Sequence, residues 1–150
     1  MDFDITLAKT PGFLRRLTAM LYDLVLLFGV LLLAVLVVVF PYGAIIGEFP
    51  HQEPLHRLAL QFYLVAVIGI FYGYFWVCGG QTLGMRAWRL RLLREDGDPL
   101  RPRDALLRLL WATISLMPLG VGFLWMLVDS NRLTLYDRLS HTRPVMIKKG

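Results

Sequence analysis

Apolar residues gather in three long runs along the chain, separated by polar segments. The first run extends from about Leu17 to Phe40, and the second extends from Leu58 to Val77. An α-helix rises about 1.5 Å per residue, so about 20 residues cross the roughly 30 Å hydrocarbon core of a bilayer. Both runs reach this length. The pattern therefore predicts two full transmembrane helices.

The third apolar run, Ala105 to Val128, is interrupted at Pro118-Leu119-Gly120. Proline and glycine break helices, so the run divides into two pieces of roughly a dozen residues. Two arrangements fit this pattern. One is a re-entrant hairpin with both ends on the same side of the membrane, and the other is a single kinked crossing.

A polar segment between the second and third runs has the pattern of a short strand. From Trp88 to Leu92 apolar and basic residues alternate, and Glu95–Pro99 is a turn sequence. The tail Thr142–Ile147 also looks extended, and two short strands are useful mainly when they pair. The predicted fold class is an all-α membrane protein: a small bundle of two transmembrane helices and a third apolar segment, with a short cytoplasmic β-strand and turn element.

Composition supports this class, because 57% of the 150 residues are hydrophobic. That share is too high for a soluble domain with an ordinary polar surface. No linker or low-complexity tract divides the chain, so residues 1–150 are predicted to form a single domain.

The basic residues predict the orientation. Seven arginines lie between Gly79 and Arg108, and the net charge is +5. They flank apolar runs, which favours contact with anionic lipid over binding of nucleic acid. The positive-inside rule places this segment and the N-terminus in the cytoplasm. Five further Lys and Arg residues follow the third run, which favours the re-entrant hairpin and a cytoplasmic C-terminus. The candidate lipid head-group contacts are Arg86, Arg89, Arg91 and Arg94.

Two charged residues stand out, one directly before the first run and one within it. Arg16 and Asp23 are seven positions apart, which places them on the same helical face about two turns apart. A charge near the bilayer centre costs roughly 2.5–3.5 kcal/mol, so we expect Asp23 to have a charged partner. That partner is either Arg16 or an arginine of another segment.

The segment DSNRLTLYDRLSHT after the third run contains a second group of charges. Asp137 is the main candidate there for a charge network, or an ion or proton site, with Arg16 and Asp23. The supporting candidates are Asp129, Arg138 and Thr142.

Catalysis and cofactor binding are not expected from this sequence, because no catalytic motif is present. Glu48, His51, Glu53 and His56 are possible metal ligand types, but their spacing matches no recognised zinc motif. We interpret them as a solvated outer loop. The sequence predicts neither a metal nor a cofactor.

Three motifs in order resemble the RDD family of small bacterial membrane proteins. They are Arg16 with Asp23, GGQTLGMRAWRLRLLREDGDPL after the second run, and LTLYDRLSHT after the third. The resemblance places the arginine and two aspartates of the family on Arg16, Asp23 and Asp137. Tyr136 and Ser140-His141 depart from the residues common in the last motif. The resemblance implies a multi-pass protein of the bacterial inner membrane, and transport has been suggested for the family.

Two functions fit these observations. The first is a non-enzymatic structural, assembly or accessory subunit of an inner-membrane complex, in contact with lipids and with another membrane protein or a second copy of itself. Its basis is the shortage of interior polar residues that could line a path. The second is a small ion or proton-coupled transporter that uses Asp23 for cation/proton exchange as an oligomer.

Overall fold

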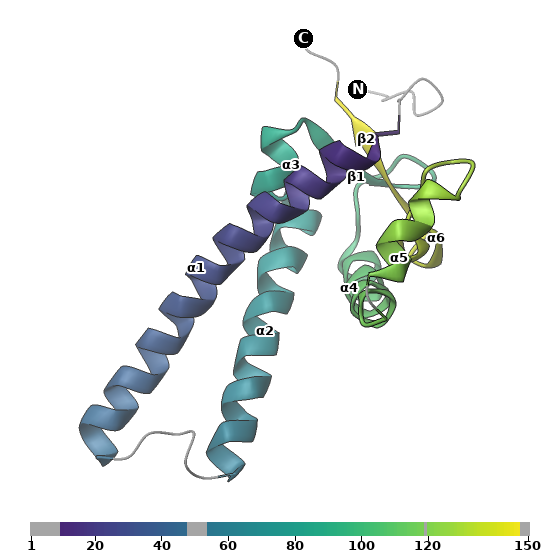
Figure 1. Cartoon of the computed structure of the whole chain (residues 1–150). Helices are drawn as coiled ribbons and strands as arrows, with labels where there is room; N and C mark the ends of the chain where they lie inside the picture. Colours follow the sequence, from purple (N-terminus) through teal and green to yellow (C-terminus); the bar gives the residue numbers. More distant parts are fainter. Residues whose placement is uncertain (1–9, 48–53, 119, 148–150) are drawn as a thin grey trace. The chain divides into compact units, whose positions relative to one another are not determined.

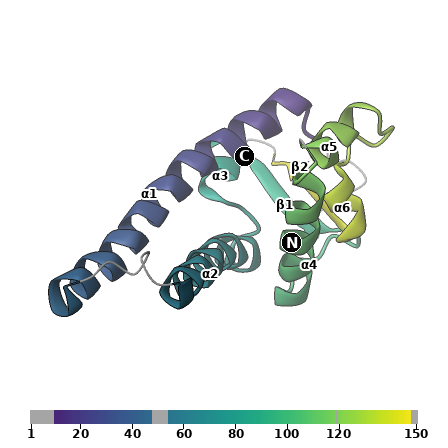
Figure 2. The ribbon, with the colours of Figure 1, turned by 60° about the horizontal axis from the view of Figure 1, so that its bottom comes forward.

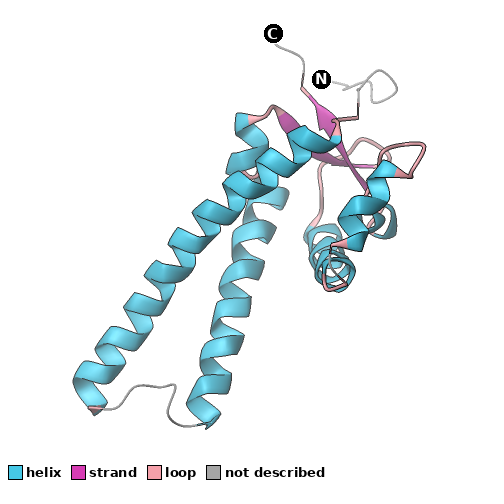
Figure 3. Ribbon diagram, viewed as in Figure 1, coloured by secondary structure: helices cyan, strands magenta, loops and turns pink. Residues whose placement is uncertain are grey.

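The computed structural model describes residues 10–47, 54–118 and 120–147. The described chain is mostly helical, with two strands that form one sheet (Figure 1, Figure 3).

Two long helices contain the first two apolar runs. Helix α1 is Phe13–Ile46 and helix α2 is Pro54–Cys78 (Figure 1). Within the described residues, these are the two helices long and apolar enough to cross a membrane. Val25 on α1 and Ile70 on α2 are each 70% exposed, as expected of side chains that face lipid. The prediction of two apolar helices of transmembrane length is confirmed.

Both helices extend beyond their apolar runs. The first apolar run ends at about Phe40, but α1 continues through Pro41 to Ile46. Proline lacks an amide hydrogen and removes one helical hydrogen bond, yet the end of α1 stays regular, because Gly47 still donates to the Gly43 carbonyl at 3.0 Å.

The predicted outer loop is correspondingly shorter. His56 lies within α2, and its Nε2 is 3.2 Å from the Tyr42 hydroxyl. The other loop residues considered as ligands, Glu48, His51 and Glu53, lie outside the described residues.

The chain divides into two compact units. We call residues 1–23 with 72–150 the polar unit, and residues 24–71 the apolar unit. Within the apolar unit the Tyr63 hydroxyl donates to the Ala34 carbonyl at 3.4 Å, which links its two helical segments. The boundary in α1 follows Asp23, where the charged residues of that helix end. The single-domain interpretation concerns the folding of the whole chain and stays a prediction.

The polar unit contains the sheet. Strand β1, Leu90–Arg94, pairs antiparallel with strand β2, Thr142–Met146, and Leu92 faces Pro144 in the register. The predicted pairing of two short strands is confirmed. The first strand begins two residues later than expected, because Trp88 ends the short helix α3, Leu83–Ala87, and Arg89 turns the chain with a φ of 56°.

The third apolar run folds back on itself. It contains α4, Pro102–Leu116, the short helix α5, Val121–Leu124, and a 3-10 turn, η2, Trp125–Leu127. A Cβ on Gly122 would lie 2.3 Å from the Ser115 Cβ. Seven residues of continuous helix would instead separate such atoms by about 10 Å. The run is therefore not one continuous helix, and Gly120, with a φ of 73°, lies in the reversal. How the run meets the membrane, by re-entry or by a kinked crossing, stays a prediction.

The last helix, α6, is Leu135–Leu139. It packs on α4, α5 and β2, and Figure 2 shows these elements gathered beside the strands. Phe123, Met126 and Tyr136 form a buried apolar cluster, against which Phe13 and Leu17 at the start of α1 pack. This packing brings the first turns of α1 to the charged residues of α6.

Candidate functional site: a buried charge cluster

Asp137 is held in place by its own helix. Thr134 caps α6: its hydroxyl accepts from the Asp137 amide at 3.2 Å, and Asp137 Oδ2 accepts from the Thr134 amide at 3.0 Å. This reciprocal pair is a capping box, encoded locally by the sequence TLYD. The carboxylate is 0% exposed and is fixed before any contact from another element is counted.

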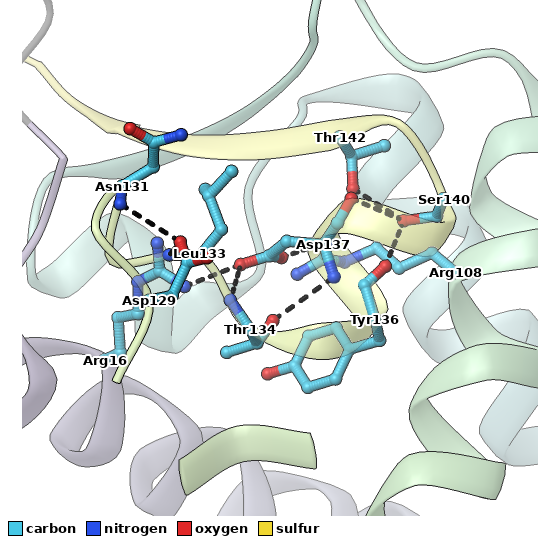
Figure 4. A network of polar contacts seen from close by, with 10 residues as sticks. All are labelled: Arg16, Arg108, Asp129, Asn131, Leu133, Thr134, Tyr136, Asp137, Ser140 and Thr142. Carbon is cyan, nitrogen blue, oxygen red and sulfur yellow. Dashed lines mark hydrogen bonds and ion pairs between the residues drawn. The ribbon is translucent and has the colours of Figure 1, made fainter. Parts of the chain in front are cut away.

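Two arginines from distant elements bind the two oxygens of this carboxylate. Arg16 Nη1 on α1 donates to Oδ2 at 2.6 Å, and Arg108 Nη1 on α4 donates to Oδ1 at 2.6 Å (Figure 4). Both arginines are buried, with 6% and 4% exposure. A buried charge is stable only when it is paired and hydrogen-bonded, so Asp137 joins α1, α4 and α6 at one point.

Arg108 makes several further contacts. Its Nη1 also donates to the Thr142 hydroxyl at 2.6 Å, and this hydroxyl is 2.8 Å from that of Ser140. Its guanidinium carbon lies 4.9 Å from the ring centre of Tyr136 and 5.4 Å from that of Trp76. Cation–π attraction therefore adds to the ion pair in holding the guanidinium.

The electrostatics favour an ionised Asp137. Burial alone raises the pKa of this carboxyl, but the Arg108 and Arg16 guanidiniums and the hydrogen bonds to Thr134 outweigh it. The net result is a pKa below the ordinary value of an aspartate.

Asp23 has a different set of partners from the one predicted. The Thr82 hydroxyl donates to its Oδ2, and the Gly84 amide donates to its Oδ1 at 2.8 Å. Among the described residues Asp23 forms no ion pair, and Arg16 turns to Asp137 instead. The direct partners of Asp23 are therefore uncharged, and an indirect approach of an arginine to this carboxylate stays a prediction. The physical reason is that short α3 presents a hydroxyl and a free amide to a carboxylate only 4% exposed.

A pocket of about 40 Å³ has Asp23, Arg16 and Arg108 on its wall. Buried Nε and Nη2 of Arg16 and Nε of Arg108 have no hydrogen-bond partner among the described residues. This volume is enough for at least one water molecule. The pocket thus offers unused donors beside a carboxylate, in a site too small for an organic ligand.

Comparison with known proteins gives the family of the chain. A family model described as the RDD family matches residues 10–141. The chain belongs to the RDD family. Comparisons with curated proteins and with solved structures found no match.

The matched range of the RDD chain includes the three charged residues on which the resemblance was based. The structure brings Arg16 and Asp137 into direct contact, although 121 residues separate them in sequence. Asp23 lies on the wall of the adjacent pocket rather than in the ion pair.

The supporting candidates divide between two places. Thr142 belongs to the cluster through Arg108. Asp129 and Arg138 instead pair with each other at 2.5 Å, and Asp129 also accepts from the amides of Asn131 and Leu133. These bonds shape the loop before α6 and hold the pKa of Asp129 below its ordinary value, chiefly through the Leu133 amide.

The candidate lipid contacts of the RDD chain lie on α3, on β1 and in the turn between them. Arg86 and Arg89 are exposed, and Arg91 is half-buried. Arg94 is bound by acidic side chains, at 3.0 Å from Asp96 and 3.6 Å from Asp104. Arg86 and Arg89 are therefore the freer cations, and lipid binding by this set stays a prediction.

Sequence reasoning missed three residues of the cluster: Arg108, Thr82 and Thr134. Arg108 was counted only among the basic residues that orient the chain. The sequence did contain a signal that Arg108 is buried. This arginine recurs at helical spacing with Ala105 and Ser115, and the three share the buried face of α4. Within the described residues, no group of three or more acidic, histidine or cysteine side chains could hold a metal.

Proposed function

We propose that this RDD protein is a non-enzymatic structural or accessory subunit of a bacterial inner-membrane complex. The observation that carries the proposal is that both carboxylate oxygens of Asp137 are already bound. Both of its oxygens accept from buried arginines at 2.6 Å, and the Thr134 amide adds a third bond. A carboxylate held in this way is suited to fixing elements together, because changing its protonation would leave two buried guanidiniums unpaired.

The two strands support a common side for the segments that contain them. Because β1 and β2 are hydrogen-bonded to each other, the arginine-containing segment and residues 142–146 lie on one side of any membrane that α1 and α2 cross. The positive-inside rule favours the cytoplasm for that side. We therefore propose a cytoplasmic N-terminus, with the last strand also in the cytoplasm.

The reversal between α4 and α5 supports a third segment that enters only part of the bilayer. Helix α4 has 15 residues, or about 22 Å of helix, which is less than the roughly 30 Å of the hydrocarbon core. Leu106, Leu110 and Ile114 recur every four residues on α4 and are 52–62% exposed. We propose that this face meets lipid or the apolar helix of a partner, which is either another membrane protein or a second copy of the chain.

The test measures ion transport by the wild type and by Asp23→Asn, and the stability of Asp137→Asn. The full chain is reconstituted in liposomes, and proton and cation fluxes are compared with those of empty liposomes. We expect no flux above the empty control, and we expect Asp137→Asn to lower stability. Flux in the wild type that Asp23→Asn abolishes without unfolding the protein would overturn the proposal.

A second candidate function, cation/proton exchange, is favoured by one specific observation. The pocket beside Asp23 contains unused donors of Arg16 and Arg108, so it can hold water next to a carboxylate. In this alternative Asp23 exchanges a proton as a cation moves, within an oligomer. The same liposomes distinguish the candidates, because exchange requires a proton flux that depends on the cation gradient.

A further inference from the structure

We propose that the polar unit contains a binding site for a phosphate group in a second pocket. This pocket has a volume of about 510 Å³. That volume lies within the usual range of about 300–1,000 Å³ for small-molecule sites. Its lining residues come from the start of the chain, the end of β1, the loop before α6, and β2: Thr10, Glu95, Ser130, Asn131, Arg132, Leu133 and Arg143. Asp23 and Asp137 do not line it, so the inference is independent of the proposed function.

Two guanidiniums in this pocket lack a counter-charge. Neither Arg132 nor Arg143 takes part in an ion pair among the described residues, and Nε of Arg143 is buried without a hydrogen-bond partner. Planar guanidiniums match the oxygens of a phosphate and bind them in bidentate fashion. The pocket therefore presents the group that phosphate sites most often use.

Of the two acidic side chains nearest the pocket, Asp129 is neutralised by an ion pair with an arginine. Asp129 is bound by Arg138 at 2.5 Å, and Glu95 lies 3.2 Å from Nδ1 of His141. Among the described residues that line the pocket Glu95 is the one carboxylate, so two arginines and one glutamate leave a positive balance there. The wall also offers the hydroxyls of Thr10 and Ser130 and the side-chain amide of Asn131 as donors. Together with the excess of positive charge, these donors favour binding of an anion.

The loop that carries Arg132 is held in place before any ligand binds. The Asp129 carboxylate accepts from the amides of Asn131 and Leu133 at 3.1 and 3.0 Å, and the Arg132 amide donates to the Asp129 carbonyl at 3.0 Å. Arg132 itself has a φ of 54°, a conformation that non-glycine residues adopt rarely. Backbone strain kept in place by surrounding bonds is common at binding sites, because it pre-orders the contacts.

The experiment uses the full chain purified in a neutral detergent and two probes. One probe is inorganic phosphate, and the other is a short-chain phosphatidic acid, each titrated by calorimetry. The test variant combines Arg132→Asn with Arg143→Gln, since asparagine tolerates the positive φ. We expect the wild type to bind at least one probe saturably and the variant to bind it about tenfold or more weakly, since hydrogen bonds to charged groups are lost.

A matched control removes two exposed arginines that lie outside the pocket and outside the candidate lipid contacts, Arg57→Gln with Arg103→Gln. It changes the net charge equally, so binding within about twofold of the wild type shows that the position of the charge decides, rather than its amount. Equal losses in both double variants would overturn the proposal, as would the absence of saturable binding of either probe. Unfolding curves of both variants establish that they are folded, and Arg132→Asn alone, at an exposed position, gives a second test.

The two probes also separate the sources of the phosphate. Binding of inorganic phosphate supports a soluble phosphate compound as the ligand. Saturable binding of phosphatidic acid without binding of inorganic phosphate supports a lipid head group. In the second case neutral-detergent micelles that contain phosphatidic acid should bind the wild type saturably, and the Arg132→Asn, Arg143→Gln variant should bind them more weakly.

Discussion

The backbone of Gly84 packs directly against that of Ala19, so that a Cβ at position 84 would lie 2.2 Å from the Ala19 carbonyl oxygen and 2.9 Å from the Asp23 carboxyl carbon. The atom in the way belongs to the backbone of α1 and cannot rotate aside. Glycine is therefore required at this position by space, and its amide is at the same time a donor to Asp23.

Gly84→Ala should accordingly destabilise the protein. Forcing a methyl group into this contact separates α3 from α1, and overpacking of this kind costs about 1–3 kcal/mol. Unfolding by sodium dodecyl sulfate in mixed micelles, followed by circular dichroism, measures the change. Gly29→Ala is the control, because nothing lies within 4 Å of a Cβ there and alanine favours a helix. Equal stability of Gly84→Ala and the wild type would contradict the packing described.

Asp137→Asn should have the largest effect of the single charge changes. It removes the counter-charge of Arg16 and Arg108 while both guanidiniums stay buried, and breaking a buried pair costs about 3–5 kcal/mol. Asp98→Asn is a suitable control, since Asp98 is 64% exposed and lies 3.9 Å from Arg94. We expect that control to stay within about 0.5 kcal/mol of the wild type in the same unfolding measurement.

The lowered pKa of Asp137 predicts the direction of the acid response. An aspartate in the unfolded chain has a pKa of about 3.9, and the folded pKa is lower, so the unfolded state binds more protons between the two values. Stability from this group is present above about pH 4 and is lost as pH falls through the folded pKa. Melting temperatures of the wild type between pH 3 and 7 should therefore fall at the acid end. The Asp137→Asn variant should show a shallower fall, and parallel curves would contradict the assignment.

Thr82→Val should weaken the contact between α3 and α1. The substitution keeps the shape of the side chain but removes the hydroxyl that donates to Asp23 and accepts from the Met85 amide at 3.2 Å. Leaving one oxygen of a buried carboxylate without its donor costs about 1–3 kcal/mol, although the Gly84 amide still donates to the other oxygen. Thr113→Val is the matched control, because the Thr113 hydroxyl is exposed and bonds only to the Leu109 carbonyl of its own helix at 2.8 Å. Similar losses of stability in both variants would show that the hydrogen bond from Thr82 to Asp23 contributes no more than that of an exposed helix hydroxyl.

The fold was predictable where the signal is local. Apolar runs such as Leu58–Val77 specify helices by length alone, and the alternation near Leu90 and Leu92 marks a strand whose two leucines are buried. The end of α1 was not predictable in the same way. Pro41 usually signals a break, and the helix continues past it only because the remaining hydrogen bonds are made.

The sequence predicted only part of the membership of the charge cluster. The sequence indicates that Arg16, Asp23 and Asp137 matter, but not which of them touch. That choice depends on contacts across long separations, such as the one of 121 residues between Arg16 and Asp137, for which helical spacing holds no information. Helical spacing alone placed Arg16 and Asp23 on one face. In the structure the donors to Asp23 are the hydroxyl of Thr82 and the amide of Gly84.

The ion pair between α1 and α6 also orders events during synthesis of the chain. Arg16 leaves the ribosome 121 residues before Asp137 does, which at about 5–20 residues per second corresponds to roughly 6–24 s. Strand β2, which completes the sheet and supplies Thr142, emerges later still. The nascent protein therefore holds a helix with an unneutralised guanidinium until α6 has been made, and β2 completes the sheet of the polar unit only after that.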